Sequence, residues 1–190
     1  MKCPSCLGTF SKPTPQCPHC SLTLRRLDVK FGAVPRHSAL LTDRTGRLPA
    51  RDAKALRLLL RSFNSKFPQS LFSVFLTNQL PGSIWEYTFW MANRGRFGNV
   101  QAGAGDNFDL LLGIDVDARA AALVIGYGLE HYLEERDLER ALAGASGAFS
   151  VADFARGIRI CVELLTEKMK SLVKALEETE QSPASKADSS

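Results

Sequence analysis

The sequence predicts an α/β protein in which a central mixed sheet is flanked by helices and preceded by a small cysteine-containing ribbon. Three observations support this fold class. Short apolar runs, which are typical of buried strands, alternate with stretches whose apolar residues recur at helical spacing. Two of these runs follow one another across a short polar turn, as the strands of an antiparallel hairpin do. Four of the five cysteines lie within the first twenty residues.

Two C-x2-C pairs, ten residues apart, lie near the N-terminus: Cys3, Cys6, Cys17 and Cys20. Each pair directs both sulfurs of a tight turn toward one ion, and two such turns supply the tetrahedral sulfur set that structural zinc prefers. The alternatives are two disulfides, a redox pair and a rubredoxin-like iron site. An intracellular setting disfavours stable disulfides, and Phe10 alone offers aromatic cover for iron in this segment. The spacing therefore favours a closed zinc site, which leaves no open position for catalysis.

This segment resembles the short zinc ribbons at the front of many bacterial proteins. Leu7 and Ser21 stand where such ribbons usually have a glycine after each cysteine pair. His19 lies inside the second pair, and we expect it beside the metal rather than bound to it. The fifth cysteine, Cys161, lies on an apolar helix face and is expected to be an inert buried thiol.

We expect four segments along the chain. They are a zinc ribbon at residues 1–24, a basic linker at 25–37, an α/β domain with a long C-terminal helix at 38–180, and a disordered polar tail at 181–190. The first 38 residues contain six Lys or Arg and one acidic residue, and the rest of the chain has a net charge of −1. This weak basic balance argues against nucleic acid as a partner.

The strands of the α/β domain are predicted from its apolar runs, at residues 39–43, 70–80, 108–115 and 120–128. The last two are joined by the turn 116–119 and form the antiparallel hairpin. Gly126 and Gly128 interrupt the final run, and glycine in a strand interior indicates a bend or a close approach of backbone. We therefore expect these two glycines to serve close packing or unusual backbone angles.

The helices of the domain are predicted from start signals and apolar spacing: one that begins at Pro49, one that Ser83 and Glu86 cap, one over residues 134–145, and a long one that Ser150 and Asp153 cap. No apolar stretch is long enough to cross a membrane. The N-terminus also lacks the apolar centre of a signal peptide. We therefore expect a cytoplasmic protein.

Six motifs between residues 38 and 170 carry a family resemblance: Asp43, the helix start 83–87, Phe97-Gly98, Asp106-Asn107, the hairpin carboxylates Asp115 and Asp117, and the stretch 126–130. Through them the chain resembles the TPM-domain family, which is related to a thylakoid-lumen acid phosphatase of photosystem II repair. The chain departs from the family at Phe108-Asp109, where members often have Gly-Val. The resemblance implies a layered fold in which the strand with the glycine pair is central.

Five carboxylates could converge at strand ends as ligands for Ca²⁺ or Mg²⁺: Asp43, Asp106, Asp115, Asp117 and Glu130. Such a cation could polarise a phosphoryl oxygen and activate a water molecule. The alternative is that these aspartates serve turns and helix caps. The sequence leaves both interpretations open.

Two functions follow from these observations. The first is an accessory protein without catalytic activity, which binds a protein partner through its zinc ribbon and its α/β domain. The second, implied by the resemblance alone, is a divalent-metal-assisted acid phosphatase that hydrolyses phosphomonoesters. The sequence has no recognisable nucleophile or base motif, so we favour the first.

Overall fold

The computed structural model describes residues 2–10, 14–97 and 108–180, so the expected tail at 181–190 and the candidate ligand Asp106 lie outside it. Within these residues four strands form one sheet in the order β1-β2-β3-β4. Their bounds are β1 Leu41–Asp43, β2 Phe72–Thr77, β3 Leu110–Asp115 and β4 Ala120–Ile125. The helices are α1 Leu24–Phe31, α2 Ala50–Lys66, α3 Ile84–Arg94, α4 Glu135–Ser150 and α5 Phe154–Glu180.

The sheet is mixed, as the sequence predicts. Strands β1, β2 and β3 are parallel, whereas β4 runs antiparallel to β3 as the second arm of the predicted hairpin. Leu110 lies opposite Ile125 at one end of this hairpin, and Asp115 lies opposite Ala120 at the other. Because β4 ends the strand order, it is an edge strand, and the expectation of a central strand here was wrong.

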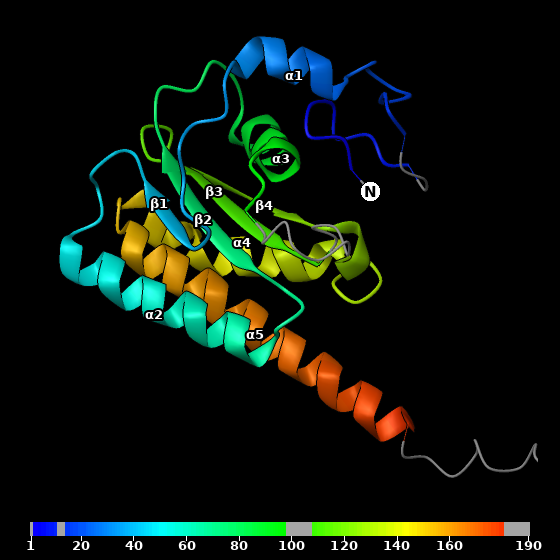
Figure 1. The fold of residues 1–190 in the computed structure, drawn as a ribbon, viewed down its shortest axis with the longest axis vertical. Coiled ribbons are helices and arrows are strands. Elements are labelled where there is room, and N and C mark those ends of the chain that lie inside the picture. Colours follow the sequence, from blue (N-terminus) through cyan, green and yellow to red (C-terminus); the bar gives the residue numbers. More distant parts are fainter. Residues whose placement is uncertain (1, 11–13, 98–107, 181–190) are drawn as a thin grey trace, which may run out of the picture.

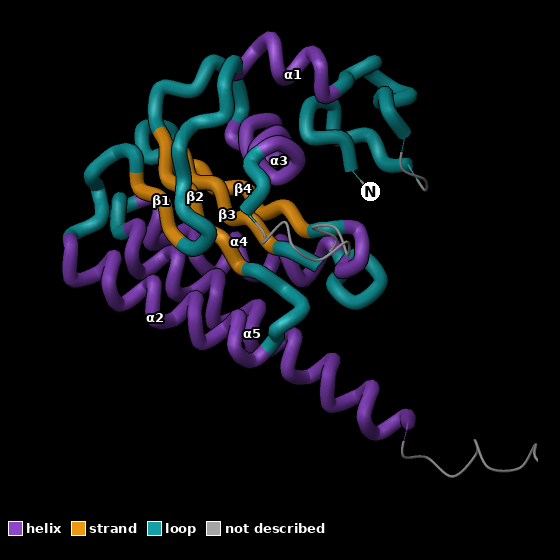
Figure 2. Tube along the Cα trace, in the orientation of Figure 1, coloured by secondary structure: helices purple, strands orange, loops and turns teal. Residues whose placement is uncertain are grey.

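Helices cover both faces of the sheet (Figure 1). Helix α3, with α1 packed on it, lies on one face, and α2, α4 and α5 lie on the other. The N-terminal segment consists mainly of loops and sits beside α3 (Figure 2). The last turns of α5 extend beyond the body of the domain.

The alternation of side chains along the strands builds two separate cores. In β2, Val74 and Leu76 point into the core shared with α2, α4 and α5, and Phe75 between them points toward α3. In β3, Leu112 likewise points into the core shared with α2, α4 and α5, and Leu111 points toward α3. Every residue of these two strands is buried, as expected for strands with helices on both faces.

A side chain of α3 approaches the backbone closely at Gly113 of β3. A Cβ atom built on Gly113 of β3 would lie 2.0 Å from the Thr88 hydroxyl oxygen of α3. That hydroxyl is held in place because it donates to the Ile84 carbonyl at 2.7 Å. Gly126, in contrast, has φ −70° and ψ 153°, an ordinary extended backbone, and it lies after β4 rather than within it. The expectation of unusual backbone angles at Gly126 was therefore wrong.

The predicted basic linker contains helix α1. Thr23 caps its N-terminus by accepting from the Arg26 N–H at 3.2 Å, and Gly32 follows it with φ 76°. Leu27 is buried against α3, and the Phe31 ring lies 5.1 Å from that of Tyr87. Helix α1 therefore packs into the second core of the domain.

Other boundaries also differ from the predictions. The last strand ends at Ile125, and the short 3₁₀ helix Tyr127–Leu129 follows it. Helix α4 continues through Ser150, so this residue cannot cap α5; the Asp153 carboxylate does so by accepting from the Arg156 N–H at 3.1 Å. Among the described residues, no helix combines the length and apolarity needed to cross a bilayer.

Candidate metal centre

Two equivalent turns position the four N-terminal cysteines. In the first, the Cys3 N–H donates to the Gly8 carbonyl at 2.9 Å, and the Leu7 N–H donates to the Cys3 carbonyl at 3.0 Å. In the second, Cys17 and Ser21 make the corresponding bonds at 2.8 and 2.9 Å. These short-range bonds curl each C-x2-C pair so that both of its sulfurs face the same side.

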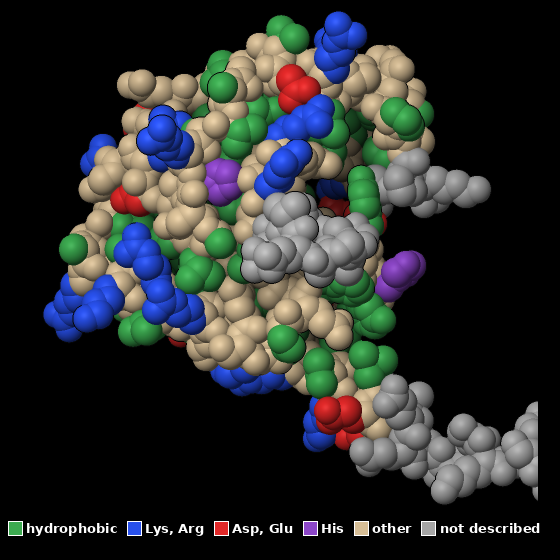
Figure 3. Space-filling model, in the orientation of Figure 1, with side chains coloured by type: hydrophobic (Ala, Val, Ile, Leu, Met, Phe, Trp, Pro, Cys, Tyr) green, Lys and Arg blue, Asp and Glu red, His purple; other side chains and the backbone are tan. Residues whose placement is uncertain are grey.

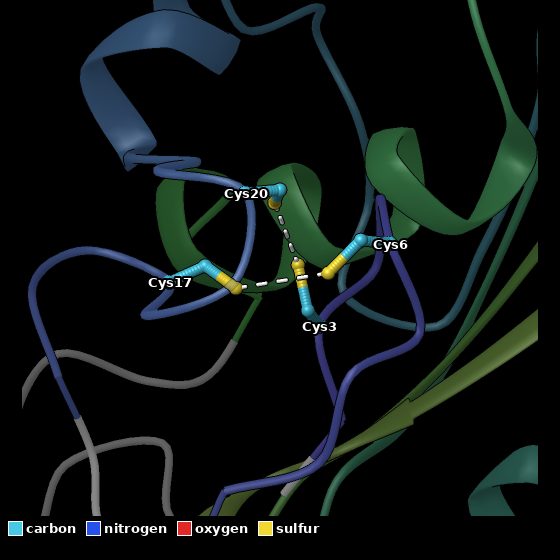
Figure 4. A group of neighbouring side chains, drawn as sticks. All are labelled: Cys3, Cys6, Cys17 and Cys20. Carbon is cyan, nitrogen blue, oxygen red and sulfur yellow. Dashed lines mark hydrogen bonds between the residues drawn. The ribbon is translucent and has the colours of Figure 1, made fainter.

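The four sulfurs converge on one point between the two turns (Figure 4). The Cys3 and Cys20 sulfurs are 3.6 Å apart, those of Cys6 and Cys17 are 3.8 Å apart, and all four lie within 4.8 Å of one another. A tetrahedral zinc with Zn–S bonds of about 2.3 Å requires sulfur separations of about 3.8 Å. A disulfide needs about 2.05 Å, so the spacing fits a metal ion. The set is closed, because every tetrahedral position has a cysteine.

The turns also favour the charged form of a ligand. Burial acts to raise the pKa of Cys17, but the backbone N–H groups of Cys20 and His19 point at its sulfur and lower that pKa to about 6. Burial raises the pKa of Cys3 to about 12, so a metal ion that binds there would have to displace that proton. The His19 ring lies 3.2 Å from the Thr9 carbonyl, beside the cysteine set and outside it.

Leu7 and Ser21 adopt the left-handed backbone conformation, with φ 59° and 60°. This conformation costs little for glycine but strains residues with a Cβ atom. It explains why ribbons of this kind usually have glycine directly after each pair. This chain forms the same turn without it.

The ribbon is fixed to the domain by polar contacts. Lys2 forms an ion pair with Glu135 of α4. Glu86 of α3 is 8% exposed and pairs with Lys30 of α1. Burial acts to raise the pKa of Glu86, but the hydrogen bonds from Lys30 and from Ser5 of the ribbon outweigh it and lower that pKa. The second residue of the predicted capping box therefore joins three parts of the chain.

Asp43, at the C-terminal end of β1, organises the loop that follows it. One carboxylate oxygen accepts from the Thr45 N–H at 2.8 Å, the Thr45 hydroxyl at 2.6 Å and the Gly46 N–H at 3.1 Å, and the other accepts from the Leu48 N–H at 2.8 Å. Burial acts to raise the pKa of Asp43, but these bonds outweigh it and lower that pKa. The carboxylate thus serves its own loop.

The hairpin separates the other described carboxylates. Asp115 ends β3, and one of its oxygens accepts from the N–H groups of Asp117 and Ala118 in the turn. Glu130 follows β4 and therefore lies beyond the opposite end of the hairpin, a strand length of about 17 Å away. Among the described residues, the four cysteines are the one set of three or more potential ligands that comes together.

Asp109, at the departure from the family pattern, also has a structural role. Its carboxylate accepts from the Leu71 N–H at 2.9 Å and so ties the start of β2 to the start of β3. Sequence reasoning did not detect this contact, because the partners are 38 residues apart. It also missed the contact between Asp28 of α1 and the Arg94 guanidinium of α3, at 3.0 and 2.8 Å.

Basic side chains occur in separate groups on the face drawn in Figure 3, one of them along the flank of α2. The exposed basic residues of that helix are Arg51, Lys54, Arg57, Arg61 and Lys66. Separate groups of this kind form no continuous track for a nucleic-acid backbone on this face.

No protein-family model matches the chain, and no curated protein matches its sequence. Solved domains with a similar fold do exist. The N-terminal domain of a protein from P. gingivalis aligns with a TM-score of 0.59 at 23% identity, over 70% of this chain and 83% of that one. The BA42 protein of the psychrophilic bacterium Bizionia argentinensis aligns with a TM-score of 0.57 at 12% identity, over 68% and 86%.

A third similar structure is the N-terminal domain of the cg2496 protein from Corynebacterium glutamicum, with a TM-score of 0.55 at 15% identity, over 72% of this chain and 83% of that one. At these identities the similarity shows the fold alone. The protein therefore has a TPM-like α/β fold, with a four-cysteine cluster near its N-terminus.

Proposed function

We propose that this protein is a non-catalytic accessory protein, which holds one structural zinc ion and binds a protein partner through the ribbon and the α/β domain together. The observation that carries the proposal is the attachment of the ribbon. Its Lys2 pairs with Glu135, and its Ser5 lies beside Glu86 and helps to lower the pKa of that carboxylate. A metal-closed module fixed to a domain presents one continuous surface made from both, which suits recognition of another protein.

The chemistry of the polar groups supports binding over catalysis. A catalytic zinc keeps a position open for water, whereas here four cysteines surround one point. Asp43 and Asp115 direct their oxygens at backbone N–H groups of their own loops. We place the protein in the cytoplasm, because a four-thiolate site needs cysteines that stay reduced.

The test compares hydrolysis of a generic phosphomonoester with capture of a partner. Wild type, Asp43→Asn and Glu130→Gln are assayed with Ca²⁺, with Mg²⁺ and with chelator, and Glu163→Gln on α5 serves as a surface control. We expect equal background rates in all four proteins. Robust metal-dependent turnover that is lost in Asp43→Asn or Glu130→Gln, with folding intact, would establish the phosphatase instead.

Partner capture completes the test. Proteins cross-linked to the wild type in cells are identified, purified and bound again in isolation to the wild type and to Cys17→Ser. We expect the purified partner to bind the wild type at least tenfold more tightly than the zinc-free variant, because the variant loses the ribbon's part of the composite surface. Equal binding to both would show that the ribbon takes no part.

A further inference from the structure

A groove of about 480 Å³ lies between the ribbon and the α/β domain, along the outer edge of β4. Apolar side chains from the ribbon, α3 and α4 form its walls: Pro4, Leu7, Trp85, Phe89, Leu138 and Leu142. Leu7 is 55% exposed and Trp85 is 38% exposed. Two large apolar side chains thus remain in contact with solvent on either side of a seam between two parts of the chain, which is typical of an interaction site.

The floor of the groove offers main-chain hydrogen bonds. The Gly126 N–H donates to the Asp109 carbonyl at 2.8 Å. In an antiparallel pair, the backbone N–H and C=O groups of successive residues point alternately toward and away from the partner strand, so this bond sets the direction of these groups at every position of β4. The backbone groups of Ala122 and Val124 therefore face β3. Those of Ala121, Leu123 and Ile125 face away from β3, toward the outer edge of the sheet, where β4 has no strand neighbour among the described residues. Leu123 and Ile125 line the groove.

The rim of the groove is acidic. Four glutamates line it: Glu130, Glu134, Glu135 and Glu139. Lys2 is the basic residue that lines it, and this lysine pairs with Glu135. Arg136, which is not part of the lining, pairs with Glu134. The excess of negative charge beside an apolar floor favours an occupant that carries both apolar and basic side chains.

We propose that this groove binds an extended segment of a partner protein, which pairs with β4 as a fifth strand, inserts alternate apolar side chains between α3 and α4, and directs Lys or Arg toward the glutamate rim. Three outward-facing positions on β4 match a segment of about five or six residues. This inference rests on the proposed function and adds to it the chemistry of the partner segment. It also gives the ribbon a role, because Pro4 and Leu7 complete one wall.

The probe is a synthetic nonapeptide of alternating Lys and Val with blocked ends, added to zinc-loaded full-length protein. Amide hydrogen exchange is measured by NMR at each position of β4. We expect exchange at Leu123 and Ile125 to slow at least tenfold when the peptide saturates the site, because their N–H groups gain acceptors. Ala122 and Val124 are internal controls, since their amides already bond to β3.

Three comparisons test the two parts of the proposal. A peptide with Glu in place of Lys tests charge, and a peptide N-methylated at every second residue tests main-chain pairing without any change in the protein. Glu139→Arg should weaken binding of the basic peptide by about three- to tenfold at low salt. Glu163→Arg, an exposed glutamate on α5 away from the groove, should leave it unchanged.

Ala121→Pro is a further variant, because proline at an outward-facing edge position removes a donor without breaking the ladder to β3. We expect it to lose peptide binding with its fold intact, and the N-methylated peptide gives the same information if this variant does not fold. Unchanged exchange at Leu123 and Ile125, or equal binding of all three peptides, would overturn the proposal. So would a concentration-dependent dimer abolished by Ala121→Pro, which would make a second copy of the chain the occupant.

Binding of the partner identified by cross-linking distinguishes a failure of this inference from a failure of the proposed function. If Ala121→Pro and Glu139→Arg both keep full affinity for the purified partner, the groove assignment fails and the accessory function stands. If no purified protein binds the wild type, the function itself fails.

Discussion

The ribbon and the α/β domain are stabilised by different means, although they belong to one chain of 190 residues. Among the described residues of the ribbon, Cys3 and Cys17 are the buried apolar side chains. The domain, in contrast, buries continuous clusters on both faces of its sheet. A segment of about 20 residues cannot bury enough apolar surface to fold alone, and a metal ion bound by the four cysteines would supply what the small core lacks.

Helix α1 lies between the ribbon and the α/β domain in the chain, and the core of the domain stabilises it. Leu22, Leu24 and Phe31 pack against the cluster around Trp90, although Leu22 comes two residues after Cys20 of the cysteine set. Loss of the metal should release the cysteine turns and leave α1 on α3.

The largest expected effect comes from removal of the metal site. Cys17→Ser should abolish zinc binding, worth about 10–16 kcal/mol in small zinc modules. Amide exchange in residues 2–10 and 14–22 should become fast, while the strands and α5 stay protected. Elemental analysis and residue-resolved exchange measure both effects.

Cys161→Ser is the matched control, because it changes the same atom in the other part of the molecule. Cys161 is fully buried, and its thiol lies 3.5 Å from the Ala141 carbonyl. We expect this variant to keep one zinc per chain while the domain loses stability. Freshly purified, reduced wild type without zinc would contradict the whole comparison.

A smaller effect is expected from Gly113→Ala, which should destabilise the domain and leave zinc binding unchanged. The new methyl group would meet the Thr88 hydroxyl, and overpacking of this kind costs about 1–3 kcal/mol. Gly147→Ala on α4 is the control, since its added Cβ would meet no atom within 4 Å apart from its chain neighbours and the backbone of its own helix. It should stabilise the helix by about 0.5–1 kcal/mol. Urea unfolding measures both, and a stable Gly113→Ala would show that α3 can move away.

These two glycines also illustrate what the sequence could and could not predict. Apolar runs and turn residues predicted the strands and the hairpin, because such signals are local. The contact between Gly113 and Thr88 joins two elements that no local pattern relates. Gly126 and Gly128 predicted close packing or unusual backbone angles because they interrupt an apolar run, yet Gly126 has an ordinary backbone conformation.

The candidate sites show the same difference between local signals and contacts that depend on the whole fold. The cysteine set was predictable because both turns are local and their spacing is diagnostic. The carboxylates were not, because their positions depend on strand direction, and one antiparallel strand places Glu130 at the opposite end from Asp115. Helix α1 does have a local signal: Thr23 is a cap residue, and apolar residues follow it at 24, 27 and 31. The basic residues around these positions led to the prediction of a linker.

The backbone of the cysteine turns offers a subtler test of the ribbon. Ser21→Gly should stabilise the zinc-bound ribbon by about 1 kcal/mol, because the left-handed conformation at φ 60° costs glycine little. This corresponds to about fivefold tighter zinc binding, measured by competition with a chelator. Ser21→Ala keeps the Cβ atom and should give no gain. A gain in both variants would assign the effect to the lost hydroxyl group instead.

The smallest effect concerns the attachment of α1 to α3. The hydrogen bond from Arg94, together with that from the Trp90 indole N–H at 2.9 Å, lowers the pKa of Asp28. A lowered folded-state pKa contributes stability that is present above the unfolded value of about 3.9 and is lost as the pH falls through the folded value. Asp28→Asn should therefore lower the thermal midpoint near pH 7 and flatten its fall below about pH 4. The Trp90 indole resonance reports the same titration directly. Asp117→Asn, in the hairpin turn, is the control for a general loss of negative charge, and an indole resonance that stays fixed through this range would show that Asp28 does not hold α1 in place.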